Sequence, residues 1–219
     1  MGPIWAYRIT DEGLNTGTAE RVAIMPAGHS LPSSERIREF VIAAHGDLGK
    51  VKQIANESPE LVNTAYPWSE TDSETAIQAA AQMGNAPIAE YLLEKGAPLE
   101  ICTAAMLGRR DEVSSLLEEK PDRISAKGAH GIPLLTHAAW SSNMELVQFL
   151  YEKGARAGVT SALHNAVRKG NYDISKWLLE NAKPDLRWKD FQGKTALEVA
   201  VEHRREDIAR LLRENGAAE

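Results

Sequence analysis

Histidine and cysteine are the residue types in this sequence that could bind a metal ion or attack a substrate, and the chain has six histidines and one cysteine. Neutral imidazole is a common transition-metal ligand, and His130 and His137 flank the stretch from Gly131 to Pro133 closely enough for a ligand pair. A third histidine, cysteine or carboxylate does not recur nearby at metal-ligand spacing. We therefore interpret both histidines as groups that stabilise a turn by hydrogen bonds, with a metal site as the alternative.

The one cysteine, Cys102, stands between Ile101 and Thr103 in a short apolar segment. A small buried thiol is the expected role there, and a reactive thiol is the alternative. The chain has no glycine-rich phosphate loop, His-Glu-x-x-His helix or Gly-x-Ser-x-Gly elbow. Its carboxylates recur beside lysines at helical spacing, which is typical of a solvated face. The sequence predicts a protein that is not an enzyme and that needs no cofactor or metal.

Composition and charge exclude several classes of partner. The 219 residues hold 25 Lys and Arg against 31 Asp and Glu, which gives a formal charge of −6 and no general attraction to nucleic acid or anionic lipid. No apolar run approaches the roughly 20 residues of a membrane-spanning helix, and the N-terminus lacks a charged region followed by an apolar one. We expect a soluble cytoplasmic protein that binds neither nucleic acid nor membrane.

The elements that position these residues repeat along the chain. Each copy has a short helix ending in small residues, two variable residues, a turn position, and a second helix with an apolar anchor eight positions beyond the turn. Six copies fit, numbered here in chain order, with turn positions Gly46, Gly84, Gly108, Ser142, Gly170 and Arg204 and anchors Ile54, Leu92, Leu116, Leu150, Leu178 and Leu212. One helix pair cannot bury its apolar face alone, so the copies must stack into a continuous core.

The spacing between copies is uneven. Successive turn positions are 38, 24, 34, 28 and 34 residues apart. A helix pair takes roughly 20 residues or slightly more, so only the longer steps leave room for a further connecting segment. This β-turn segment of about ten residues is called a finger below. The spacing predicts long fingers before copies 2, 4 and 6 and truncated ones before copies 3 and 5.

Several stretches resemble the ankyrin repeat. The first-helix pattern is matched by Thr75-Ala-Ile-Gln-Ala-Ala-Ala, Leu163-His-Asn-Ala-Val and Thr195-Ala-Leu-Glu-Val-Ala-Val, and the second-helix pattern by Ile88-Ala-Glu-Tyr-Leu-Leu-Glu-Lys-Gly-Ala and Leu146-Val-Gln-Phe-Leu-Tyr-Glu-Lys-Gly-Ala. The resemblance implies an all-α ankyrin-repeat solenoid of about six helix-turn-helix repeats with short β-turn fingers. It implies that His164, at the first-helix histidine, hydrogen-bonds between neighbouring repeats. Longer stretches, among them His45-Gly-Asp-Leu and Ala104-Ala-Met-Leu-Gly-Arg, are similar to bacterial ankyrin-repeat proteins. This similarity implies a prokaryotic source and identifies no particular activity.

The predicted domain boundaries follow the repeat. Residues 36–219 form the ankyrin-repeat domain, and residues 1–35 form an N-terminal arm or capping segment, either as a small hairpin or as a loose arm. Charged and apolar residues alternate in copy 6, as expected of a terminal cap. Arg204 stands there where glycine is usual at the turn.

The resemblance also places a binding surface, because the two residues before each turn line the concave groove of ankyrin proteins. In copies 2 to 4 this row has apolar members, and in copy 5 it is basic. We expect an apolar strip that contacts a partner, basic residues that meet an acidic residue of that partner, and finger aromatics that extend the groove. The predicted partner-binding residues are, in that order, Met83, Met106, Leu107 and Trp140; Arg168 and Lys169; Tyr66 and Trp68. The alternative is that the apolar side chains fold back and fill the stack. Trp188 and Phe191 are further aromatics on the last finger.

The sequence thus favours a non-catalytic interaction module that binds a peptide or protein partner on the concave groove and acts as a monomer. The alternative is a metal- or thiol-dependent enzyme, or a small-ligand-binding protein, with a site near His130, His137 or Cys102. Fold alone does not identify the partner, because ankyrin arrays bind many unrelated proteins.

Overall fold

The computed structural model describes residues 32–218. The compact unit that carries the helices begins at Ser34. The predicted arm or capping segment, residues 1–35, therefore falls almost entirely outside the described residues.

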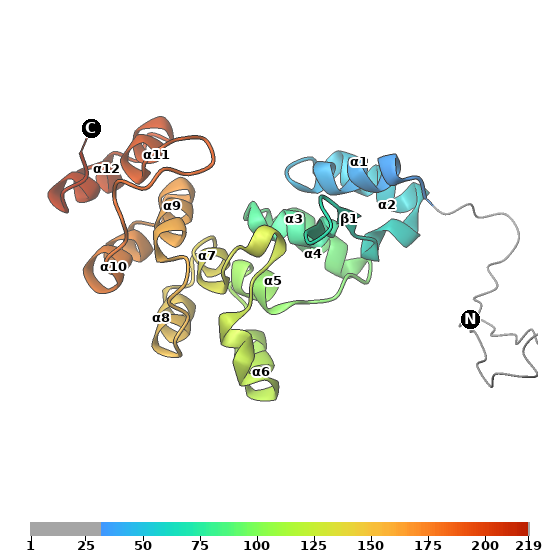
Figure 1. The fold of residues 1–219 in the computed structure, drawn as a ribbon, viewed down its shortest axis with the longest axis horizontal. Helices are drawn as coiled ribbons and strands as arrows, with labels where there is room; N and C mark the ends of the chain where they lie inside the picture. The colour runs from blue at the N-terminus through green and yellow to red at the C-terminus, as the bar shows by residue number, and fades with distance from the viewer. Residues whose placement is uncertain (1–31, 219) are drawn as a thin grey trace, which may run out of the picture. The chain divides into compact units, whose positions relative to one another are not determined.

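Six helix-turn-helix pairs, one for each predicted copy, follow one another as an arc (Figure 1). In chain order the pairs are α1 (Ser34–Ala44) and α2 (Leu48–Glu57), α3 (Ala76–Gln82) and α4 (Ala86–Glu94), α5 (Ile101–Met106) and α6 (Arg110–Glu119), α7 (Leu134–Ala138) and α8 (Met144–Glu152), α9 (Val159–Lys169) and α10 (Tyr172–Ala182), and α11 (Ala196–Glu202) and α12 (Glu206–Glu214). The expectation of an all-α repeat solenoid is confirmed.

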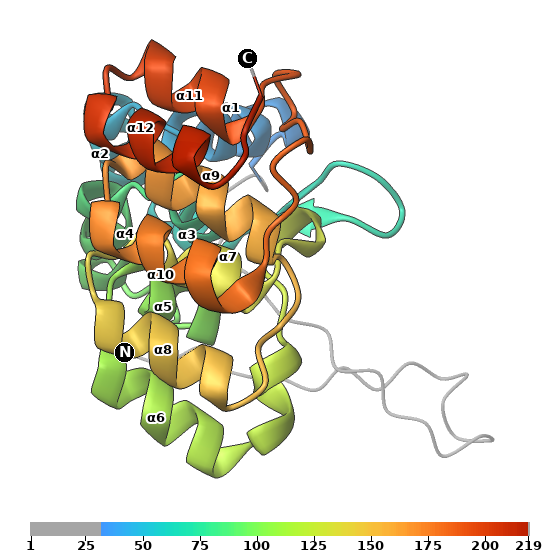
Figure 2. The same cartoon turned by 90° about the vertical axis from the view of Figure 1, so that its left-hand side faces the viewer.

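The connections between pairs alternate in length as the spacing predicted. The fingers before α3, α7 and α11 are long, whereas residues 95–100 and 153–158 are the whole of the connections before α5 and α9. The long fingers carry the 3-10 turns η2 (Pro59–Asn63), η3 (Pro121–Ser125) and η4 (Ala129–Gly131) and the strands β1 (Tyr66–Pro67) and β2 (Ser73–Glu74). β1 and β2 pair antiparallel with Tyr66 opposite Glu74, and their finger projects from the edge of the array (Figure 2).

Local caps fix where many of the helices begin. Thr75 and Thr195 each form a capping box, in which the threonine side chain accepts from the backbone three residues on while Gln78 or Glu198 accepts from the threonine N–H. Asn143 caps α8 by accepting from the N–H of Leu146. These residues satisfy backbone donors that the first helical turn leaves without partners.

The turn of copy 6 keeps a left-handed backbone without glycine. Arg204 has φ of +56°, close to the +66° of Gly84 and the +73° of Gly108 at corresponding turns. A side chain with Cβ crowds the backbone in this region, which costs about 1–2 kcal/mol. The turn is therefore formed at a local energetic cost.

Five of the six predicted anchors are fully buried: Ile54, Leu92, Leu150, Leu178 and Leu212. The prediction is only partly right at Leu116, which is half-buried and packs at the side of the core. In α6 the buried positions are Val113 and Leu117, four residues apart, because the apolar face of this helix is turned by one residue.

Two hydrophobic clusters form the core. One is built mainly from the first two helix pairs and the other from the last four. Met106 of α5 and Trp140, just after α7, belong to the first cluster although their helices otherwise belong to the second. These two side chains therefore tie the two clusters together. None of the described helices is long and apolar enough to cross a membrane.

Candidate functional site

A cavity of about 710 Å³ runs along the inner helices between the fingers. This volume lies within the range of roughly 300–1,000 Å³ that is typical of ligand pockets. We call it the groove. Its lining comes from the end of the first pair, the inner helices and two fingers: His45, Gln82, Met83, His130, Gly131, Ile132, Pro133, Thr136, Trp140, Ser161, His164, Asn165, Arg168, Trp188, Asp190 and Phe191.

Exposed apolar side chains gather at the groove. Met83, Trp188 and Phe191 line it and are 40%, 41% and 81% exposed, and they are among the most exposed large hydrophobic residues of the described chain. Exposed apolar side chains are costly to leave in water, and where they gather they mark binding sites. The groove is thus a surface suited to contact with another molecule.

An ion pair joins α9 to the finger before α11. The Arg168 guanidinium donates to Asp190 Oδ2 at 2.7 Å, and Asp190 Oδ1 accepts from the N–H groups of Gln192 and Lys194. Burial opposes ionisation of Asp190, but these N–H donors and Arg168 outweigh it and hold the pKa of the carboxyl below its usual range. The finger carboxylate therefore neutralises the basic residue at this side of the groove.

His164 lies beside this pair. The residue is 2% exposed, and the centroid of its ring is 4.8 Å from that of Trp188 in an edge-to-face arrangement. Burial lowers the pKa of the imidazole to about 4, and the nearby Asp190 carboxylate opposes this only in part. Both ring nitrogens are shielded from solvent, and Nδ1 lies 4.0 Å from Asp190 Oδ2 in the finger of the next repeat. The imidazole of His164 therefore packs between α9 and the finger before α11.

The other end of the groove holds a second polar group of side chains. His45 Nδ1 donates to the carbonyl of Val41, and Gln82 Nε2 lies 2.9 Å from His45 Nε2, which therefore accepts. His130 Nδ1 donates to Asp72 Oδ2 at 2.5 Å. This last contact joins the finger before α3 to the finger before α7 across 58 residues of sequence.

A buried carboxylate stands behind His130. Glu74 is fully buried, and its Oε2 accepts from the indole N–H of Trp68 and lies 3.4 Å from His130 Nε2. Burial lowers the pKa of His130, but Asp72 and Glu74 outweigh this effect and raise it above its usual value. His130 is thus a link between two fingers that becomes stronger when the imidazole is protonated.

The expected apolar strip is only partly exposed. Met83 and Trp140 both line the groove, but Met83 is 40% exposed and Trp140 only 8%. Met106 is 3% exposed and Leu107 half-buried, and neither lines the groove. The expectation that Met106 faces outward is wrong. Copy 3 has no long finger, so copies 2 and 4 approach each other and cover the pre-turn residues of copy 3.

The remaining predicted site residues lie around the groove. Arg168 lines it and pairs with Asp190 of its own chain, and Lys169 is exposed outside the lining. Tyr66 and Trp68 pack edge to face with centroids 4.8 Å apart, and neither lines the groove. The centroid of the Trp68 ring lies 6.3 Å from that of His130, which does line the groove.

His137 and Cys102, which belong to the alternative site predicted from the sequence, are both buried. His137 is 1% exposed, its Nδ1 donates to the carbonyl of Ala81, and burial lowers its pKa to about 4. Burial, with a contribution from Glu100, raises the pKa of the Cys102 thiol to about 12, so the thiol stays protonated and unreactive at neutral pH. Among residues 32–218, no three His, Cys, Asp or Glu side chains come together in a group that could hold a metal ion.

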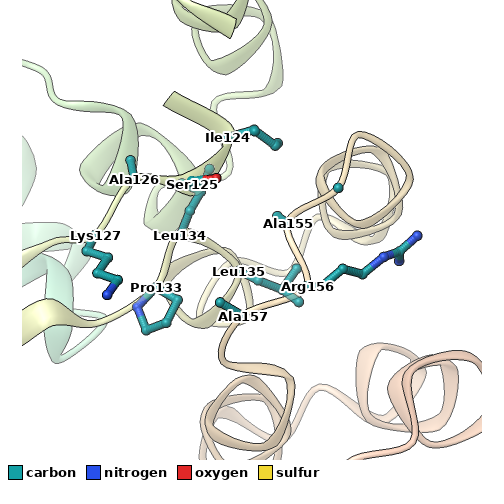
Figure 3. A pocket seen from close by; sticks show the side chains of 11 residues that line it. Ile124, Ser125, Ala126, Lys127, Pro133, Leu134, Leu135, Ala155, Arg156 and Ala157 are labelled. Carbon is teal, nitrogen blue, oxygen red and sulfur yellow. The ribbon is translucent and has the colours of Figure 1, made fainter. Parts of the chain in front are cut away.

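A second cavity of about 150 Å³ lies between the finger before α7 and the short connection before α9. Leu134, Leu135 and Pro133 contribute to its lining, while the side chain of Arg156 points away from it (Figure 3). Arg156 packs instead over the ring of Tyr151, 3.4 Å from the ring centroid. This small cavity brings no catalytic pair together.

Sequence reasoning missed Asp190. A signal for Asp190 exists, because Asp followed by Gly193 indicates a turn in which the carboxylate accepts backbone N–H groups. Its contact with Arg168 spans 22 residues and leaves no local pattern. The family pattern implied contact of His164 with a neighbouring repeat, and the ring does pack on Trp188 of the next finger.

Comparison with known proteins agrees with the fold. A family model for three ankyrin repeats matches residues 135–218, and a model for a single ankyrin repeat matches residues 72–104. Together these matches cover more than half of the 219 residues. The chain belongs to the ankyrin-repeat family.

Three curated relatives are similar over parts of the chain. An ankyrin repeat protein of Rickettsia bellii is 29% identical over 96 residues, which are 41% of this chain and 53% of the relative. The E3 ubiquitin-protein ligase KEG of Arabidopsis thaliana is 29% identical over 52% of this chain and 7% of its own. A homolog of transient receptor potential cation channel subfamily A member 1 from Caenorhabditis elegans is 31% identical over 64% of this chain and 12% of its own. The chain thus spans about half of the first relative and a small part of the others.

Proposed function

We propose that the protein is a cytoplasmic, non-catalytic interaction module that acts as a monomer and holds a peptide or a folded protein partner in the groove. Ankyrin repeats are in general protein–protein interaction modules, and the chain is built from six of them. The proposal assigns that general role to one surface of this chain.

The gathering of exposed apolar side chains at the groove carries the proposal. Trp188 and Phe191 come from the last finger and Met83 from the end of α3, so parts of the chain more than 100 residues apart contribute to one surface. Aromatic residues and methionine are enriched where proteins bind one another, because they bury large areas and adapt to the partner. Lys169, exposed beside the groove, is a candidate for the rim.

The buried members of the predicted row have another role in this proposal. Trp140 forms the wall of the groove rather than a free contact, and Met106 and Leu107 support that wall from the core. Tyr66 and Trp68 hold the finger that His130 contacts. Such residues shape a binding site without making up its exposed surface.

Selection from a phage-displayed peptide library tests the proposal, with Phe191→Ala as the test variant and Tyr172→Ala as the matched control. Phe191 is 81% exposed in the groove, and Tyr172 is 37% exposed on α10 outside it. Peptides selected on the unmodified protein should bind Phe191→Ala at least about tenfold more weakly and Tyr172→Ala equally well. Equal binding by all three proteins would place the interaction elsewhere.

A further inference from the structure

We propose that His130 acts as a proton-operated latch between the finger before α3 and the finger before α7. The latch, made of His130, Asp72 and Glu74, is closed when both imidazole nitrogens carry a proton and is released when one proton is lost. This proposal goes beyond the proposed function, because it concerns how one wall of the groove is held in place. It can therefore be tested without a ligand.

The two ring nitrogens of His130 face one carboxylate each. Nδ1 lies 2.5 Å from Asp72 Oδ2, and Nε2 lies 3.4 Å from Glu74 Oε2. A protonated imidazole donates at both nitrogens, whereas a neutral one keeps a single N–H and has a lone pair at the other nitrogen. In either neutral tautomer, one carboxylate therefore faces a lone pair instead of a proton. Loss of one proton turns one of the two attractive contacts between the fingers into a repulsive one.

Glu74 gives the second contact its strength. Its side chain is fully buried, and within the described residues Oε1 has no hydrogen-bond partner while Oε2 accepts from the indole N–H of Trp68. A buried carboxylate without a positive charge nearby costs free energy. A proton on Nε2 of His130 supplies that charge, whereas a lone pair at the same nitrogen repels the carboxylate.

The other charged and titratable groups around the latch do not replace this proton. His45, which follows α1, places Nε2 3.8 Å from Glu74 Oε2, but that nitrogen accepts from Gln82 Nε2. The Arg38 guanidinium of α1 lies over the ring of Trp68, 6.0 Å from the ring centroid. The helix α3, which also packs against η4, contributes no charged side chain. The charge of Glu74 is therefore balanced from the finger before α7.

The backbone of His130 is also arranged for this contact. Its φ of +56° and ψ of +21° are left-handed, a region that is unfavourable for a residue with Cβ. This conformation lets the backbone N–H donate to Asp72 Oδ1 at 3.3 Å while Nδ1 binds Oδ2 of the same carboxylate. Strained backbone persists where surrounding contacts hold it. Weakening of the latch therefore removes contacts that keep the finger in this conformation.

The latch exists because copy 3 has no long finger. The connection before α5 is residues 95–100, so η4 of the finger before α7 packs against β2 and α3 of copy 2. Ile132 and Pro133, which follow η4 directly, line the groove, as His130 does. The latch thus fixes the position of this wall relative to copy 2, and its release allows the two fingers to separate.

The latch closes in acid and is released in alkali. Burial lowers the pKa of His130, but the hydrogen bonds and charges of Asp72 and Glu74 outweigh this effect and raise the pKa above its usual value of 6.5. The closed latch binds the proton more tightly than the open one, so protonation favours closure. The contribution of the latch is fully present below about pH 6.5 and is lost as the pH rises through the raised value.

A distance measurement between the two fingers tests the latch in the full chain. Ser69→Cys and Ser125→Cys place spin labels at exposed, uncharged positions on the fingers before α3 and α7, while the buried Cys102 thiol stays unreactive. Pulsed electron paramagnetic resonance should give a mean distance that is more than about 2 Å longer at about pH 8.5 than at about pH 6. The same distance distribution at both pH values would overturn the proposal.

Two histidine variants of the labelled protein assign the movement to His130. Asparagine tolerates a left-handed backbone but has no titratable proton, so His130→Asn should give the longer distance at both pH values. His203→Asn, at an exposed histidine outside the groove, should respond to pH as the labelled parent does. An undiminished pH response of folded His130→Asn would contradict the assignment and overturn the proposal.

A titration of the protein without any histidine variant covers the case in which His130→Asn folds poorly. In ¹⁵N-labelled protein, the imidazole nitrogen signals of His130 should titrate with the same midpoint as the change in distance, and that midpoint should lie above pH 6.5. A His130 midpoint more than about one pH unit away from that of the distance change would overturn the proposal. A His130 midpoint at or below pH 6.5 would do the same.

The latch has a consequence for binding that rests on the proposed function. Closed fingers preform the groove wall, so a histidine-free peptide from the library should bind at least about threefold more tightly at about pH 6 than at about pH 8.5. His130→Asn should lose this pH dependence, and its persistence in that variant would overturn the proposal. If no peptide binds in a way that depends on Phe191, the proposed function fails, while the finger distances still decide the latch.

Discussion

The indole N–H of Trp140 donates a 2.9 Å hydrogen bond to the carbonyl of Gln82, and this contact joins the fourth helix pair to the second across 58 residues of sequence. The connection before α5 is only residues 95–100, so no long finger separates the two pairs. His130, in the finger before α7, likewise contacts Asp72, in the finger before α3. The third pair is therefore covered at its inner side, which explains why Met106 is buried.

Trp140 should act on stability more than on contact with a partner. Its ring is 8% exposed and packs in the core of the first two pairs, so Trp140→Ala should lower the free energy of unfolding by about 3–5 kcal/mol. Phe191→Ala, at a side chain that is 81% exposed, should cost much less. Urea denaturation measures both. A loss for Trp140→Ala no larger than that for Phe191→Ala would show that Trp140 does not join the two clusters.

Gly84 should not tolerate a side chain, because it lies against the same indole. A Cβ at this position would meet the Trp140 ring at 2.4 Å, and φ is +66°. Gly84→Ala should therefore destabilise the protein by more than about 2 kcal/mol, through both overlap and backbone strain. Gly96→Ala is the control, since it has a similar φ of +93° and no atom within 4 Å. Equal thermal melting of the two variants would contradict the close approach of Trp140.

Stability should fall on acidification because of His137 and His164. Burial lowers both pKa values to about 4, while the unfolded chain takes up these protons near pH 6.5. Their contribution is fully present above about pH 6.5 and is lost as the pH falls towards 4, by up to about 3 kcal/mol for each histidine. His130 has the opposite sign: its pKa is raised, so its contribution is present below about pH 6.5 and is lost as the pH rises through its folded value.

Urea denaturation at about pH 7.5 and about pH 5 measures this dependence. The unmodified protein should be less stable at the lower pH, and the difference should shrink in His137→Gln, which removes one of the two buried imidazoles. Asp72→Asn should enlarge the difference, because it removes a contact that favours protonated His130. A pH difference that is the same in all three proteins would contradict these assignments.

Arg204 offers a stabilising substitution. Its φ of +56° is unfavourable for a residue with Cβ, and glycine relieves the strain, partly offset by the greater freedom of glycine in the unfolded chain. Arg204→Gly should raise the free energy of unfolding by about 1 kcal/mol. Arg204→Ala removes the same charge and keeps Cβ, so it should give no such gain. A gain shared by both variants would assign the effect to charge rather than to backbone strain.

The fold could be predicted from the sequence because its rules are local. The offset of eight from turn to anchor and the uneven steps between turns fixed six helix pairs and the order of long and short fingers. Leu116 departed from the pattern because α6 turns its apolar face towards Val113 and Leu117. That rotation depends on tertiary packing, which the spacing does not contain.

The candidate site was less predictable because its key contacts are distant in sequence. Met83, Trp140 and Arg168, which the family pattern selected, line the groove. It did not show that Trp140 bonds to Gln82 or that Arg168 is neutralised by Asp190. Both contacts depend on which fingers are missing and on how neighbouring pairs then converge. Whether the predicted residues bind a partner stays a prediction.

The indole N–H signals of the tryptophans test the central claim, that the groove is the binding surface, most directly. Trp188 lines the groove, whereas Trp177 packs against Tyr151 on the outer helices and serves as an internal control. In ¹⁵N-labelled protein titrated with a peptide selected from the library, the Trp188 indole signal should shift saturably while the Trp177 signal stays in place. A saturable shift of Trp177 with Trp188 unchanged would contradict the account.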